Sequence, residues 1–417
     1  MSGNNKQMLV PRLRFPEFQE DGEWLIPTLG DVSEPVDERV GNRKLTPISI
    51  SAGIGFVPQS EKFGRDISGN QYKLYTVVRD GDFVYNKGNS LKFPQGCVYD
   101  LQDWGEVAAP NVFICFRLKE GYENGFYRQC FENNAHGIQL RRHITSGARS
   151  NGLLNISKEA FYGIKIPTPK VAEQKKIADC LSSLDDLLTA EAQKLDTLKA
   201  YKKGLLQQLF PREEETVPRL RFPEFLNTGE WIPRTIGDTC ETFSGGTPST
   251  ANKAYYGGDI PFIRSAEIEK YETELYLTKE GLENSAAKMV KKGDVLIALY
   301  GANSGEVSLS KINGAINQAI LCLRHESNNA FVYQYILHRK EWIIATFLQG
   351  GQGNLSGEII KSIQLLFPKP IEQQKIADFL LAIDGQIDAQ TKKIEALKLH
   401  KKGLMQRLFP ILLEVSE

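Results

Sequence analysis

The sequence predicts two globular segments of mixed strands and helices, each closed by a long helix, with the two helices packed on each other. Three observations lead to this fold. The chain repeats itself with a period near 200 residues, each copy ends in a long run with a heptad pattern, and the segments between are rich in short strand and turn patterns. At 417 residues the chain is long enough for several domains of ordinary size.

The internal repeat decides the domain organisation. The segment VPRLRFPEF at Val10–Phe18 recurs without change at Val217–Phe225, and GEW follows each copy. Later in each half, EQKKIADCL from Glu173 recurs as EQQKIADFL from Glu372, and KKGLLQQLFP recurs as KKGLMQRLFP. Each half is therefore a variable segment followed by a near-constant ending.

The near-constant endings are predicted to be long helices. From Glu173 to Phe210 the chain has no proline, and apolar residues recur at spacings that alternate between four and three. This spacing is typical of a coiled-coil seam, and about 38 residues at 1.5 Å each would form a rod of roughly 57 Å. Since neither apolar stripe is stable alone in water, we expect the two helices to hide them against each other. The predicted seam residues are Ile177, Leu181, Leu184, Leu188, Leu195, Leu198 and Leu205 in the first helix and Ile376, Leu380, Ile383, Ile387, Ile394, Leu397 and Leu404 in the second.

Prolines and polar residues set the limits of these helices. Pro169 and Pro370 stand just before the two helices, and a further proline follows each. The polar residues that interrupt the seams recur in the same places, Glu191 with Gln390 and Lys202 with Lys401. The chain is therefore predicted to have a first globular domain with its repeat segment at 1–167, a first long helix at 168–211, a second globular domain with linker and repeat segment at 212–368, and a second long helix with a tail at 369–417.

The two variable segments have a common frame. Each has a Gly-Asp turn that opens an apolar strand, at 81–85 and at 293–297, and each later has an Asn before an apolar strand that carries Cys and Arg, at 111–117 and 317–324. A shared frame with different loops is what two related domains that bind different sequences would show.

The loops of both segments carry side chains suited to nucleic acid. Arg suits guanine and Asn or Gln suits adenine in the major groove, whereas Lys, Ser and the backbone amides of glycines suit phosphate. Any one of these residues is more often a solvated loop side chain, so the prediction depends on the set. The predicted DNA contacts are Lys87, Asn89, Ser90, Lys92, Arg141, Arg142, Arg149 and Asn151 in the first segment and Gly246, Thr247, Lys253, Tyr255, Arg264, Asn303, Ser304, Gln352 and Asn354 in the second.

Composition limits the possible functions. The 51 basic residues balance the 51 acidic ones, which argues against a protein that binds DNA over a broad, sequence-blind surface. The six cysteines lie far apart, so a zinc site or a redox pair is not expected. The polar start of the chain and the lack of any apolar run near 20 residues predict a cytoplasmic protein with no membrane contact.

Catalysis by this chain is not expected. The sequence has no P-loop, no glycine-rich cofactor loop followed by an acidic residue, and no Pro-Pro-aromatic motif of amino-methyltransferases. None of its five histidines is paired at metal-ligand spacing. The prediction is a chain with no catalytic residues, no metal and no cofactor of its own, and methyl transfer to DNA by the pure chain would contradict it.

With its duplicated halves and the helix ends described above, the sequence resembles the specificity subunits of type I restriction-modification systems. The stretches GGTPSTANKAYYGGDIPFIRSAEI, at Gly245–Ile268, GDVLIALYGANSGEV and GQGNLSGEIIKSI also resemble a common form of that family's target-recognition domain. The first variable segment departs from this form, since it has no GGTPS-like stretch.

The resemblance implies a fold and a set of partners. The fold is two globular α/β target-recognition domains separated by an antiparallel coiled coil of two long helices, in a pseudo-twofold repeat. The partners are double-stranded DNA, two methyltransferase subunits and ATP-dependent restriction subunits, with S-adenosylmethionine, ATP and Mg carried by the partner subunits. Two dissimilar domains on a rigid spacer would read a bipartite, asymmetric target with half-sites about one helical turn, roughly 34 Å, apart.

A duplicated adaptor whose globular domains bind proteins would look similar at this level. Footprinting on random duplexes distinguishes the two, because only a DNA-binding protein protects two patches on one face.

A half-chain of residues 1–211 is expected to self-associate through its exposed helix and, with methyltransferase, to read a palindromic site. Analytical ultracentrifugation tests this, and a strictly monomeric fragment would contradict the packing of the seams.

Overall fold

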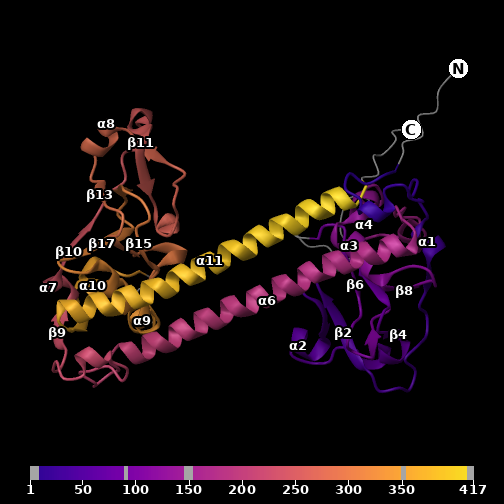
Figure 1. Cartoon of the computed structure of the whole chain (residues 1–417), viewed down its shortest axis with the longest axis horizontal. Helices are drawn as coiled ribbons and strands as arrows, with labels where there is room; N and C mark the ends of the chain where they lie inside the picture. Colours follow the sequence, from indigo (N-terminus) through magenta and orange to yellow (C-terminus); the bar gives the residue numbers. More distant parts are fainter. Residues whose placement is uncertain (1–8, 89–92, 145–153, 349–353, 411–417) are drawn as a thin grey trace. The chain divides into compact units, whose positions relative to one another are not determined.

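The computed structural model describes residues 9–88, 93–144, 154–348 and 354–410. The chain folds as two compact units, of which unit 1 is Met1–Ala190 with Ile394–Glu417 and unit 2 is Glu191–Lys393. Each unit combines one globular segment with parts of both long helices (Figure 1). The four parts predicted along the chain therefore make two units, because each long helix is divided between them.

Among its described residues, unit 1 has two four-stranded sheets, with strand orders β1-β8-β5-β6 and β3-β2-β7-β4. All pairs are antiparallel except β2 with β7. The strands are β1 Ser33–Pro35, β2 Thr46–Ser51, β3 Gly55–Pro58, β4 Thr76–Arg79, β5 Phe83–Asn86, β6 Cys97–Asp100, β7 Glu106–Ala109 and β8 Ile114–Leu118. The helices and 3-10 turns are η1 Pro16–Phe18, α1 Leu29–Val32, α2 Gln59–Phe63, η2 Gly69–Leu74, α3 Asn124–Glu132, α4 Ala135–Leu140, η3 Arg141–His143, α5 Lys158–Tyr162 and the first part of α6 Val171–Leu209.

Unit 2 has the same central sheet, with strand order β10-β17-β14-β15, beside a second sheet of order β12-β11-β16-β13 and the short pair β18-β9. Its strands are β9 Ile232–Thr235, β10 Cys240–Ser244, β11 Tyr256–Ile263, β12 Tyr276–Leu277, β13 Lys288–Val290, β14 Val295–Ala298, β15 Val307–Leu309, β16 Gly314–Ile316, β17 Ile320–His325 and β18 Gln364–Phe367. Its helices and turns are η4 Pro223–Phe225, α7 Ile236–Thr239, η5 Lys253–Tyr255, η6 Ser265–Glu267, α8 Lys279–Glu283, η7 Gly301–Asn303, α9 Asn329–Phe347, α10 Gly357–Ser362 and the first part of α11 Pro370–Leu408.

The two long helices run in opposite directions past each other within each unit. In unit 1, Lys401 of α11 donates to Asp185 of α6 at 2.6 Å, and in unit 2, Lys202 of α6 donates to Asp384 of α11 at 2.6 Å. Pro370 is the first residue of α11 and does not precede it as predicted, because a helix needs no N–H donor at that position. The predicted fold class, two α/β domains with an antiparallel helix pair, is confirmed.

The predicted seam residues do not all pack in the same way. Near the helix ends, Ile177, Leu181, Leu205, Ile376 and Leu380 are buried within the cores of the globular segments. Leu404, also near a helix end, is half-buried against the core of unit 1, and Ile383 belongs to the core of unit 2. The other seam residues, nearer the middle of each helix, lie half-buried, except Ile394, which is buried. The stripe therefore serves two purposes, since its ends complete the domain cores and its middle lies along the helix pair.

The polar residues that interrupt the seams have partners. Gln390 donates to the Glu191 side chain at 2.5 Å and to the Glu191 carbonyl oxygen at 2.9 Å. Burial alone would lower the pKa of Lys401, but the hydrogen bonds that it donates to Asp185 and Glu132 outweigh this effect and raise the pKa. These pairs favour one register, because a slipped helix would leave charged groups half-buried without partners.

The two aspartates that bind these lysines, Asp185 and Asp384, each also bind a helix of the globular segment in their own unit. Gln129 of α3 donates to Asp185 at 3.2 Å, and Gln334 of α9 donates to Asp384 at 2.6 Å. The same three residue types therefore meet in both units, and each time the lysine belongs to the other half of the repeat.

The ends of the long helices are exchanged between the halves. Phe210, which closes the first half, lies in unit 2, with ring centroids 4.4 Å from Tyr335 and 6.3 Å from Trp231. Phe409, which closes the second half, lies in unit 1, with its ring centroid 5.5 Å from that of Phe126. Each near-constant ending thus completes the core of the other half's globular segment.

The identical VPRLRFPEF segments are held by buried ion pairs. Arg14 donates to Glu173 at 2.8 and 2.7 Å in unit 1, and Arg221 donates to Glu372 at 2.7 and 2.8 Å in unit 2. Next to each arginine, a backbone amide donates to the exchanged helix end, Leu13 to Arg407 at 2.9 Å in unit 1 and the equivalent Leu220 in unit 2. The segment therefore ties the start of one long helix to the end of the other.

Candidate nucleic-acid interface

In unit 2, several loops meet at one end of the central sheet. After β10, the amide of Gly245 donates to Asn317 O at 3.3 Å, just before β17. After β14, the amide of Leu299 donates to Ala319 O at 2.8 Å, and Leu299 O accepts from the amide of Leu355 at 3.0 Å. The loops that carry Gly246, Thr247, Asn303, Ser304 and Asn354 are thereby gathered at one edge.

The glycine pair of the GGTPS stretch allows this close approach. A Cβ at Gly245 would lie 1.8 Å from Ile316 O, and one at Gly246 would lie 2.9 Å from the carbonyl carbon of Ala286. Gly246 is buried, so its place is a contact between two backbones, while the neighbouring Thr247 is exposed and donates to Gln318 at 2.7 Å.

The other predicted residues of unit 2 differ in their exposure to solvent. Lys253 and Asn354 are exposed, and Tyr255 is half-buried. Asn303 is half-buried, and Ser304 donates its hydroxyl to Leu299 O at 2.9 Å, as turn-forming residues do.

Arg264 is engaged within the fold. Its guanidinium donates to Glu267, whose side chain is 1% exposed, at 2.9 and 3.1 Å, and to Glu274. These hydrogen bonds raise the pKa of Arg264, so it stays charged, but they use the edge of the guanidinium that would bind guanine. Its position therefore favours a role in holding the turn after β11.

Unit 1 has a hydrogen bond equivalent to the one between Leu355 and Leu299. The amide of Leu154 donates to Lys87 O at 2.9 Å and holds the corresponding loops together. The Lys87 side chain donates to Ile156 O at 3.0 Å, whereas Arg141 and Arg142 of η3 are exposed. The predicted contacts outside the described residues are Asn89, Ser90, Lys92, Arg149, Asn151 and Gln352.

A buried aspartate at the Gly-Asp turn supports the central sheet in each unit. Asp82 accepts from Arg117 at 2.6 and 3.1 Å, and Asp294 accepts from Arg324 at 3.1 and 2.7 Å. Burial raises the pKa of Asp294, but the hydrogen bonds from Arg324 and the backbone outweigh it and leave the pKa below its ordinary value. This pair is the structural reason for the Gly-Asp and Cys-Arg strand patterns in the sequence.

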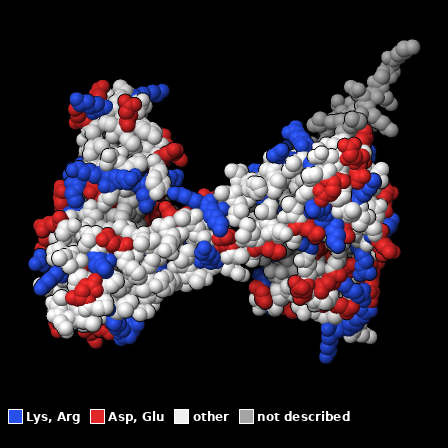
Figure 2. Space-filling model, viewed as in Figure 1, with Lys and Arg blue, Asp and Glu red and all other residues white. Residues whose placement is uncertain are grey.

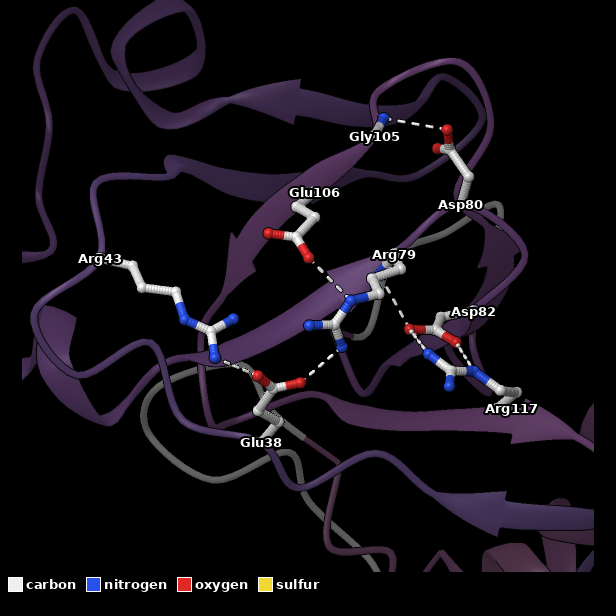
Figure 3. A network of polar contacts seen from close by, with 8 residues as sticks. All are labelled: Glu38, Arg43, Arg79, Asp80, Asp82, Gly105, Glu106 and Arg117. Carbon is white, nitrogen blue, oxygen red and sulfur yellow. Dashed lines mark hydrogen bonds and ion pairs between the residues drawn. The ribbon is translucent and has the colours of Figure 1, made fainter.

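In unit 1 the aspartate belongs to a larger network that joins the two sheets (Figure 3). The amide of Arg79 donates to Asp82, and its guanidinium reaches Glu106 of β7 and Glu38, which also binds Arg43. The hydrogen bonds from Arg79 and Arg43 lower the pKa of Glu38 to about 2. All the basic groups of this network are thus neutralised by carboxylates.

Acid is expected to destabilise unit 1 through His136, which contacts the loop before β6. Burial lowers the pKa of His136 to about 4 from 6.5, so the folded unit keeps this ring neutral. Unfolding therefore takes up a proton below pH 6.5, and stability should fall by about 3 kcal/mol between pH 6.5 and 4 and be flat above. We expect urea unfolding of His136→Gln to lose this part of the pH slope, with the exposed His143→Gln as the control; an unchanged slope in His136→Gln would contradict the assignment.

The fold brings together two lysines of unit 2 that no pattern in the sequence indicated. Lys311 follows β15, and Lys392 lies on α11, but their ammonium groups lie 5.9 and 5.8 Å from the centroid of the same Tyr271 ring. No motif connects these positions, which are 40 to 121 residues apart, so only the fold could reveal them.

The described part of the chain holds no group of three or more His, Cys, Asp or Glu residues arranged to bind a metal ion. In the same part, no helix is both long and apolar enough to cross a membrane.

A family model described as "Type I restriction modification DNA specificity domain" matches residues 80–200 and 228–399, one stretch in each half of the repeat. The chain belongs to this family. Among specificity subunits of type I restriction enzymes, it is similar to MjaIX of Methanocaldococcus jannaschii, at 29% identity over 40% of this chain and 41% of that one. It is also similar to MjaVIII of the same organism, at 23% identity over 64% and 66%, and to EcoR124I/EcoR124II of Escherichia coli, at 24% over 57% and 59%. The aligned region is thus less than two thirds of the length of each of these relatives.

The fold of the specificity family extends over nearly the whole chain. The crystal structure of a type I restriction-modification S subunit from M. genitalium matches 97% of this chain and 100% of its own, with a TM-score of 0.63 and 14% identity. A chain from a structure of a type I restriction-modification system covers 93% of this chain, with a TM-score of 0.54 and 17% identity. Both show the likeness of fold.

Proposed function

We propose that this chain is the sequence-specific DNA-recognition subunit of a type I restriction-modification complex. The observation that carries the proposal is the family match in both halves, combined with two units that share a frame but differ in the loops at one end of the central sheet. Two such units would read two different half-sites, so the target would be bipartite and asymmetric.

In this proposal the chain reads DNA and leaves the chemistry to other subunits. The near-constant segments occur twice, so they would bind two copies of one partner, the methyltransferase subunit. Restriction subunits would join that complex, with S-adenosylmethionine, ATP and Mg bound by the partner subunits in the cytoplasm. The helix pair, which runs through both units, would set the spacing of the half-sites.

Mapping of methylated adenines tests this function directly. Random-sequence DNA is treated with the full chain and its methyltransferase, and the modified adenines are located by sequencing. The expected result is one split motif with two unlike halves. Methylation without a motif, or a motif that stays the same when unit 2 loops are exchanged for those of a relative, would overturn the proposal.

The alternative, an adaptor whose globular units bind proteins, predicts a different footprint. With methyltransferase present, a DNA-recognition subunit protects two patches on one face of the duplex, whereas an adaptor protects none. The neutralised arginines of unit 1 are compatible with either function, so the footprint is the decisive measurement.

A further inference from the structure

The surface of unit 2 carries a cluster of lysines around an exposed tyrosine. Tyr271 is 57% exposed, and the ammonium groups of Lys311 and Lys392 each lie within 5.9 Å of its ring centroid. The two ammonium groups are therefore no farther apart than the sum of these two distances. Their fields add, and each ammonium group lies at a cation–π distance from the ring.

Two more lysines lie next to this pair. The amide of Lys292 donates to the Asn313 side chain at 2.8 Å, which places Lys291 and Lys292 beside the loop that carries Lys311. Both are exposed. Figure 2 shows Lys and Arg side chains in a belt across unit 2 that reaches α11.

This lysine cluster, Lys291, Lys292, Lys311 and Lys392, lacks the carboxylate partners that other lysines of unit 2 have. Lys340, Lys361 and Lys375 each pair with a glutamate at 2.7 to 3.3 Å. Within the described residues, no carboxylate lies within 4.0 Å of any lysine of the cluster. Positive charges brought together without a carboxylate at ion-pair distance repel one another, and a bound anion would relieve that repulsion.

The repeat shows that the fold does not require this charge. The backbone pair between Asp294 and Ser310 corresponds to the pair between Asp82 and Leu101, so Lys311 corresponds to Gln102. Lys392 corresponds by the helix repeat to Gln193. The first half therefore has glutamine at both places where the second half has lysine.

We propose that Lys311 and Lys392, held over Tyr271, bind the phosphate backbone of duplex DNA, so that the DNA read by unit 2 also contacts α11. This inference rests on the proposed function and adds to it a contact that carries no sequence information. Lysine is suited to such a contact because its ammonium group binds phosphate as a point charge. The exposed Tyr271 can add its hydroxyl as a donor to phosphate.

The test compares the salt dependence of DNA binding by the full chain with its methyltransferase. The variant Lys311→Gln/Lys392→Gln installs the residues of the first half, and Lys375→Gln removes one lysine elsewhere on α11. Each lost phosphate contact should reduce the slope of log K against log salt by about 0.9, so the double variant should lose about 2 and Lys375→Gln nothing. Affinity should fall for target and random duplexes alike, while the methylated motif stays the same.

The outcomes separate this inference from the function it rests on. Lys311→Arg/Lys392→Arg should keep the wild-type slope, and equal thermal unfolding of all variants excludes misfolding. A double variant with the wild-type slope overturns the phosphate contact while leaving sequence-specific methylation intact. Loss of methyltransferase binding with an unchanged DNA slope would overturn it too, in favour of a protein-binding surface. A wild-type complex that methylates no motif would defeat the proposed function itself.

Discussion

Replacement of Arg221 by methionine is expected to lower the free energy of unfolding of unit 2 by about 3–5 kcal/mol. The side chains of Arg221 and Glu372 are only 8% and 1% exposed, and the guanidinium also donates to Gly229 O at 2.8 Å and to the Thr228 hydroxyl at 2.6 Å. Methionine fills a similar volume but leaves the Glu372 carboxylate buried without a partner at neutral pH. The lost free energy of unfolding is measured by urea unfolding of the full chain, monitored by tryptophan fluorescence, and hydrogen exchange assigns it to unit 2.

The chain supplies its own control two residues away. Arg219 also pairs with a glutamate, Glu215, but these side chains are 54% and 31% exposed, so Arg219→Met should cost no more than about 1 kcal/mol. The double variant Arg221→Met/Glu372→Gln should recover part of the loss, since no uncompensated charge remains. Equal effects of the two arginine variants would show that burial of the ion pair is not what stabilises the segment.

The sequence predicted the elements whose cause is local. A heptad pattern defines a helix and its apolar face, so α6 and α11 were found within a few residues of their ends. The Gly-Asp turns and the Cys-Arg strands recur because Asp82 and Asp294 each need an arginine from the neighbouring strand. Such features are visible in one sequence when it contains two copies of the same frame.

The sequence could not predict which surfaces the seams pack against. Periodicity identifies an apolar face but not its partner, so the burial of Ile177 and Leu205 in domain cores was not foreseen. In the candidate interface, too, the sequence shows the chemistry of a side chain but not its partners. Arg264 has the right chemistry for guanine, but its partners Glu267 and Glu274 are apparent only in the fold. Lys311 and Lys392 have no local motif, and only the contact of both with Tyr271 connects them.

Phe210 and Phe409 occupy matching positions at the ends of the two halves. Because the helix ends are exchanged, we expect the same substitution at each to destabilise the unit that contains the other half's globular segment. Phe210 is fully buried in the core of unit 2, and Phe409 is 8% exposed in the core of unit 1. Truncation of a buried phenylalanine costs about 3–5 kcal/mol, through lost apolar burial and the cavity that remains. Phe210→Ala, at the end of the first half, should therefore weaken unit 2, and Phe409→Ala, at the end of the second half, should weaken unit 1.

Hydrogen exchange with mass spectrometry locates each effect along the full chain. In Phe210→Ala, protection should fall in α9, whose Phe331 and Tyr335 contact the ring, and should persist in α3. In Phe409→Ala, protection should instead fall in α3 and persist in α9, because Phe126 of α3 loses its neighbour. Leu399→Ala, at a residue 72% exposed on α11, should leave both helices protected. If Phe210→Ala instead loosened α3, each ending would belong to the core of its own half, and the exchange of helix ends would be disproved.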